Sequence, residues 1–137
     1  MSNKKDVDLS EYGISQNRYR ELKYFCLQYP EWKKELESLS FIQSVKYNNV
    51  GSAGNKKSTP TENIALKKME LEAKCKLLDE VIEIALKGME YLEKSFRDNI
   101  IKGKSFEYID VPCSRSTFYR ARRNFFAALS KRLNEQH

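Results

Sequence analysis

Apolar residues recur along this chain at intervals of three and four positions, the spacing that places side chains on one face of an α-helix. One such segment runs from Ser15 to about Gln28, and a second runs from about Pro30 to Val45. Ser15 can cap the first helix, and Pro30 can open the second because the first helical residue needs no N–H group. We therefore expect residues 1–45 to form an N-terminal helical hairpin.

The apolar pattern stops over residues 46–58, where Asn, Gly, Ser and Lys predominate, a composition typical of a flexible linker. It resumes after Thr59-Pro60-Thr61-Glu62, which has the residue order of a helix start with a capping box. Because the pattern then continues to Ile101, we expect residues 59–101 to form one long central helix. Its main apolar seam alternates steps of four and three residues, as in a coiled coil, and consists of Leu71, Cys75, Leu78, Ile82, Ala85, Met89, Leu92 and Phe96.

Two partners fit this seam. The N-terminal hairpin of the same chain can pack along it, or the same helix of a second copy can do so in a homodimer. A second apolar row beside the seam indicates that more than one side of the helix is buried. The pattern favours an intramolecular core and leaves a homodimer open.

Residues 102–137 predict a helix-turn-helix after the long helix. A short helix fits residues 105–110, Pro112 breaks it, and Ser114 can cap a final helix over residues 115–133. The predicted fold class is therefore all-α, with an N-terminal helical hairpin, a long central helix and a C-terminal helix-turn-helix module.

The net charge of +6 lies mostly at the C-terminal end of the chain. Residues 102–137 hold eight Lys or Arg against three Asp or Glu, whereas residues 1–101 hold 17 against 16. Concentrated positive charge is typical of proteins that bind polyanions. The start of the last helix also carries Ser, Thr and Arg, which can hydrogen-bond to base edges in the major groove of DNA. The sequence therefore predicts an interface for double-stranded DNA at Arg115, Ser116, Thr117, Tyr119, Arg120, Arg122, Arg123 and Lys104.

The cysteines and the single histidine give no basis for a metal or catalytic site. Cys26, Cys75 and Cys113 form no C-x-x-C pair, and the one histidine is His137. A structural zinc site needs about four Cys, His or carboxylate ligands. We therefore expect no metal, no cofactor and no enzymatic activity, and we expect all three cysteines to lie in the core.

The distribution of apolar residues also bears on location. No run of about 18 apolar residues is present, so we expect no membrane-spanning segment. The first residues lack the apolar stretch of a signal peptide. We expect a cytoplasmic protein that associates with the nucleoid.

Two stretches of the C-terminal module resemble the helix-turn-helix of sigma-factor region four. They are SFEYID at residues 105–110 and CSRSTFYRARR at residues 113–123. The wider layout, with PTENIA at residues 60–65 opening the long helix, is similar to phage late-transcription regulators of the RinA and ArpU type. The resemblance implies a DNA-binding activator of phage or prophage late genes, with host RNA polymerase left open as a further partner.

The same resemblance assigns roles within the final helix and shows one departure. It makes Ser114 the cap of the recognition helix and directs Arg115, Ser116, Thr117, Tyr119, Arg120 and Arg123 toward DNA. The segment from Gly103 to Ser114 is two residues shorter than in sigma factors and contains Pro112. The first helix of the motif is therefore expected to be shortened or differently angled.

A second class of function also fits the pattern. A non-enzymatic adaptor or assembly protein would dimerise through the helix at residues 59–101 and bind nucleic acid without sequence preference. Readers of RNA display aromatic side chains that stack on exposed bases. Because Phe118, Phe125 and Phe126 have the spacing of core residues, the pattern favours duplex DNA.

Overall fold

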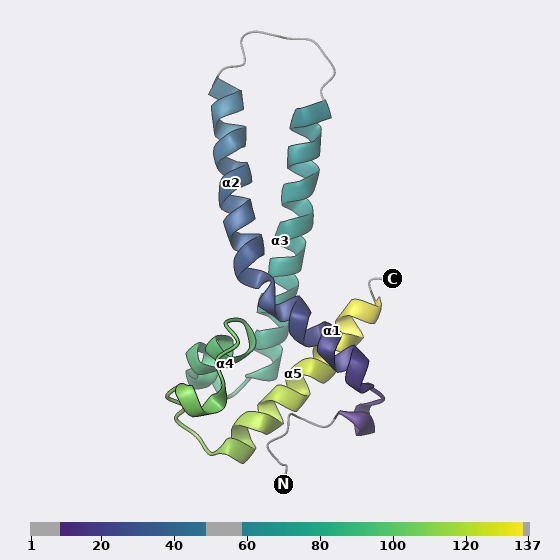
Figure 1. Cartoon of the computed structure of the whole chain (residues 1–137), viewed down its shortest axis with the longest axis vertical. Coiled ribbons are helices and arrows are strands. Elements are labelled where there is room, and N and C mark those ends of the chain that lie inside the picture. Colours follow the sequence, from purple (N-terminus) through teal and green to yellow (C-terminus); the bar gives the residue numbers. More distant parts are fainter. Residues whose placement is uncertain (1–8, 49–58, 136–137) are drawn as a thin grey trace. The chain divides into compact units, whose positions relative to one another are not determined.

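A computed structural model of the chain describes residues 9–48 and 59–135 (Figure 1). The described residues form helices and turns without any strand, so the all-α prediction is confirmed. The chain divides into two compact units. Unit 1 contains the residues up to Gln28 and those from Leu77 onward, and unit 2 spans Tyr29–Lys76.

Unit 2 is a pair of helices. Helix α2 (Tyr29–Asn48) runs beside the first part of helix α3 (Thr59–Ala85) in the opposite direction (Figure 1). The Lys68 ammonium donates a hydrogen bond to Gln43 Oε1 at 3.0 Å and joins the two helices. The predicted linker begins later than expected because α2 extends to Asn48; its residues 49–58 and the Thr59 side chain of the predicted capping box lie outside the described part of the chain.

Unit 1 contains the other helices. These are the short 3-10 helix η1 (Ser10–Tyr12), α1 (Gln16–Leu27), the end of α3, η2 (Glu90–Leu92), α4 (Glu93–Ile100), η3 (Phe106–Tyr108) and α5 (Arg115–Glu135). Helix α1 packs against α4 and α5. This grouping differs from the expected N-terminal hairpin, because the apolar face of α1 lies in unit 1 whereas α2 pairs with α3 in unit 2.

The prediction of one helix over residues 59–101 is wrong. Helix α3 ends at Ala85, and Gly88 has a φ of +83°, a left-handed conformation that ends a helix and suits glycine. The Glu90 carboxylate accepts the Gly88 N–H at 3.2 Å, and backbone hydrogen bonds from Glu90 and Gly88 lower the pKa of this carboxyl. The apolar seam nevertheless stays buried on both sides of the break, except for the half-buried Met89.

Aromatic side chains form the centre of unit 1. The Phe96 ring of α4 lies 5.8 Å from Phe118 and 5.4 Å from Phe125, both on α5. The Tyr19 ring of α1 meets Phe126 edge to face at 5.1 Å. These rings are almost completely buried, so their packing determines which face of α5 points inward.

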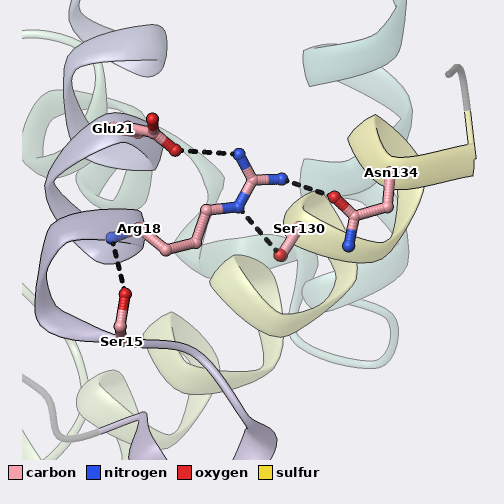
Figure 2. A network of polar contacts seen from close by, with 5 residues as sticks. All are labelled: Ser15, Arg18, Glu21, Ser130 and Asn134. Carbon is pink, nitrogen blue, oxygen red and sulfur yellow. Dashed lines mark hydrogen bonds and ion pairs between the residues drawn. The ribbon is translucent and has the colours of Figure 1, made fainter.

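Polar contacts at one edge of this core tie α1 to α5. Figure 2 shows the Arg18 guanidinium of α1 donating from Nε to Ser130 Oγ at 3.3 Å and from Nη2 to Asn134 Oδ1 at 2.9 Å. Its Nη1 also donates to Glu21 Oε1 at 3.1 Å. The backbone N–H of Arg18 donates to Ser15 Oγ at 3.1 Å, which confirms Ser15 as the cap of α1.

The break at Gly88 can be tested by protein stability, because replacing this glycine changes the free energy of unfolding in opposite directions in a broken and in a continuous helix. Gly88→Ala should lower the free energy of unfolding by about 1 kcal/mol, because an alanine Cβ disfavours a left-handed backbone. In a continuous helix the same change would raise it by about 1 kcal/mol.

Gly88→Asn is the matched variant, since asparagine tolerates a left-handed backbone better than alanine. Urea unfolding should rank Gly above Asn and Asn above Ala. A more stable alanine variant would contradict the break.

Candidate nucleic-acid interface

Helix α5 begins where the sequence predicts. The backbone N–H of Thr117 donates to Ser114 Oγ at 3.2 Å, and the Ser114 hydroxyl donates to Thr117 Oγ1 at 3.0 Å. This side-chain bond satisfies one of the N–H groups that a first helical turn leaves without a partner. The prediction of Ser114 as the helix cap is confirmed.

One face of α5 is polar and cationic. A rotation of about 100° per residue places Ser116, Arg120 and Arg123 in one row, and the row continues to Asn124 and Lys131. Ser116, Arg120, Asn124 and Lys131 are exposed, and Arg123 is half-buried. Neither Arg120 nor Arg123 bonds to another residue that the structure describes. We call this row, Ser116, Arg120, Arg123, Asn124 and Lys131, the α5 stripe.

The opposite face of α5 holds the stripe in place. Phe118, Phe125 and Leu129 have no exposed side-chain surface in the core of unit 1. The stripe therefore presents three cations and no carboxylate on a helix that is anchored along its length. The sequence prediction missed Asn124 and Lys131, although their distance from Arg120 along the helix could have revealed them.

Arg122 does not lie on this stripe, and its assignment to the DNA-facing set is corrected. Its side chain is only 6% exposed. Its guanidinium donates to Asn99 Oδ1 of α4 and, at 2.6 Å, to the Tyr19 hydroxyl of α1. It also lies 5.2 Å from the Phe126 ring centroid. Arg122 therefore joins three helices inside unit 1.

The remaining predicted residues lie along the other edges of α5. The Arg115 guanidinium bonds Glu107 at 2.9 Å and lies 4.8 Å from the Phe106 ring centroid and 5.5 Å from that of Tyr119. Lys104 is exposed in the loop before α5, where its carbonyl accepts the Asn99 side-chain N–H at 2.8 Å. Thr117 is half-buried at the border of the stripe. The eight predicted residues thus divide between two surfaces and the core.

The segment before α5 is less helical than predicted. Residues 105–110 contain a single 3-10 turn, η3, and the Ser105 side chain makes no capping bond. Ile109 is already extended, with φ −126° and ψ 154°. Gly103 has a left-handed conformation, with φ +76°. Residues 102–114 therefore contain no α-helix in front of α5, and the helix-turn-helix arrangement stays a prediction.

The cysteines follow the sequence prediction in part. Cys26 and Cys75 are buried, whereas Cys113 is half-buried, so the core prediction is confirmed for two of them. Burial raises the pKa of the Cys26 thiol to about 12, although the positive charge of Arg122 acts in the opposite direction.

Across residues 9–48 and 59–135, no three His, Cys, Asp or Glu side chains gather as metal ligands. The helices described there include none with the length and apolar character needed to cross a membrane.

We find no protein-family model, curated protein or solved structure that matches this chain. Function must therefore be argued from the geometry of the α5 stripe and its surroundings.

Because Arg122 is buried, we expect its replacement to destabilise the protein far more than replacement of Arg123. Arg122→Ala should lower the free energy of unfolding by about 2–4 kcal/mol, since it leaves buried polar partners unsatisfied and opens a cavity. Arg123→Ala also removes an arginine side chain, but from the α5 stripe, and should change the free energy of unfolding by less than about 0.5 kcal/mol. Chemical unfolding of both variants measures the difference, and equal effects would place Arg122 outside the core.

Proposed function

We propose that this protein binds double-stranded DNA in a sequence-specific manner through the α5 stripe. The observation that carries the proposal is that α5 presents exposed Arg120 and half-buried Arg123 on one face, while Phe118, Phe125 and Leu129 on the opposite face are buried. Both guanidinium groups are available to a phosphate or a base edge. A helix anchored in this way can enter the major groove without first becoming ordered.

The order of side chains along the stripe suits this docking. The major groove of B-form DNA is about 12 Å wide and admits one α-helix, whose first residues reach the base edges. Ser116 and Arg120 lie nearest the start of α5 and would read bases. Arg123 and Lys131 lie further along and would contact phosphates, which hold the helix in register.

The proposed biological role rests on the resemblance of the wider layout, with PTENIA at residues 60–65, to phage late-transcription regulators. The protein would activate late genes of a phage or prophage, in the cytoplasm and at the nucleoid. Host RNA polymerase and a second copy of the chain are further partners under this proposal. Of these, DNA is the partner for which the α5 stripe offers a surface.

A second candidate, a non-enzymatic assembly protein, is favoured by one observation. Unit 2 exposes large apolar side chains along its helices: Phe41 is 68% exposed, Leu66 60% and Met69 64%. Exposed apolar patches are typical of protein–protein contact surfaces. Such a protein would dimerise through unit 2 and bind nucleic acid without sequence preference.

The salt dependence of DNA binding tests the α5 stripe. Changing Arg120 and Arg123 together to Ala should weaken duplex binding and lower the slope of log affinity against log salt by about 1, because the phosphate contact assigned to Arg123 releases about one counterion. Fluorescence anisotropy with a labelled duplex measures both quantities.

The matched control changes Lys34 and Lys67 to Ala, since both are exposed in unit 2 and the net charge falls equally. The control should keep the slope of the unaltered protein. Equal slopes for the two double variants would contradict the proposal.

Selection of bound duplexes from a random pool separates the two candidate functions. A DNA regulator should enrich one sequence motif, and Ser116→Ala should change that preference more than it changes total affinity. A pool without enrichment would favour the assembly protein. Equal losses on selected and random DNA would show that Ser116 does not read bases.

A further inference from the structure

Three of the five arginines of α5 are held by other side chains of unit 1. Arg122 is buried in its core. Arg132 bonds Glu80 at 2.7 Å, and Arg115 bonds Glu107 at 2.9 Å. The other two arginines lie on the α5 stripe and bond to no other residue that the structure describes. Pairing and burial therefore restrict the cations that α5 offers to a polyanion to this stripe.

Arg115 has a special position among the paired arginines, because it is the first residue of α5 and its side chain is exposed. The start of a helix carries partial positive charge and open N–H groups, which attract phosphate. An uncancelled guanidinium at the same place would strengthen this attraction. Contacts to phosphate carry no sequence information, so a free Arg115 would bind DNA whatever its base sequence.

Glu107 cancels the charge of Arg115. Its Oε2 atom accepts a hydrogen bond from Arg115 Nη2 at 2.9 Å. The guanidinium also lies 4.8 Å from the ring centroid of Phe106 and 5.5 Å from that of Tyr119. An exposed ion pair alone is weak, but contacts with aromatic rings add attraction that holds the arginine in place. The two residues therefore form a neutral pair beside the first turn of α5.

This pair and the α5 stripe face different directions. A rotation of about 100° per residue separates Arg115 from Ser116, the first residue of the stripe. A phosphate bound at Arg115 would therefore favour an orientation of α5 in which the stripe does not face the groove. The pair with Glu107 disfavours this orientation. A binding site gains specificity when its contacts with wrong partners are weakened.

We propose that Glu107 determines the sequence specificity of DNA binding by keeping Arg115 from binding phosphates. This inference rests on the proposed binding of DNA at the α5 stripe and names a residue that limits the contact to it. Glu107 contacts no base under this account. It is a positioning residue that acts through Arg115.

Glu107→Gln tests the proposal, since glutamine has the same shape without the charge. Release of Arg115 should raise the affinity for a random duplex by about threefold or more and steepen the slope of log affinity against log salt by about 1, because one more phosphate contact releases about one counterion. The affinity for a duplex selected from the random pool should rise less, so the ratio of selected to random affinity should fall. Fluorescence anisotropy over a series of salt concentrations measures these quantities.

The matched control is Glu93→Gln. Glu93 accepts a hydrogen bond from Arg97 Nε at 2.9 Å on α4, and its side chain is 53% exposed, compared with 60% for Glu107. The control raises the net charge by the same amount and should keep the slope of the unaltered protein. Equal steepening in the two glutamine variants would overturn the proposal, because it would show a general effect of charge.

A second change assigns the effect to Arg115. The double variant Glu107→Gln with Arg115→Ala has the net charge of the unaltered protein, and both its slope and its affinity ratio should return to those of the unaltered protein. A double variant that keeps the steeper slope would overturn the proposal. Both side chains are exposed, so the variants should keep the fold, which circular dichroism checks.

The proposal for Glu107 and the proposed function fail in different ways. DNA binding that depends on the α5 stripe, together with an unchanged slope in Glu107→Gln, would overturn the role of Glu107 alone. An unaltered protein that binds no duplex, or that prefers no sequence, would overturn both.

Discussion

The arrangement of unit 1 depends on the burial of one positive charge. A buried guanidinium is stable only if its N–H groups are hydrogen-bonded and its surroundings are well packed. In Arg122 the two terminal nitrogens are hydrogen-bonded, Nη1 to Asn99 of α4 and Nη2 to the Tyr19 hydroxyl of α1, and the guanidinium lies 5.2 Å from the Phe126 ring centroid. These contacts allow α5 one orientation about its axis, because any rotation would bring Arg122 and the Phe118–Leu129 face out of the core together.

This orientation separates the cations of α5 into two surfaces. Arg120, Arg123 and Lys131 face solvent on the α5 stripe, where they can meet a polyanion directly. Arg115, at another edge, is paired with Glu107 and lies 4.8 Å from the Phe106 ring centroid. A helix that looks uniformly basic in sequence therefore offers two chemically different surfaces.

The sequence predicts local structure well and the assembly of distant parts poorly. The start of α5 and its Ser114 cap follow from adjacent residues, and both are found. The seam from Leu71 to Phe96 predicts burial correctly, yet its spacing says nothing about helix continuity, so the end of α3 at Ala85 was missed. Arg122 was wrongly placed on the DNA-facing surface, because an arginine that lies between other arginines in the sequence is expected to be exposed.

The central claim is that the α5 stripe, and not the whole basic helix, meets DNA. Side-chain Nε–H signals of the arginines, followed by NMR while duplex DNA is added, test this claim most directly. The account predicts that the signals of Arg120 and Arg123 shift with saturation, whereas the Arg122 signal stays in place and exchanges slowly with solvent. Shifts at Arg122 with unchanged signals at Arg120 and Arg123 would contradict it.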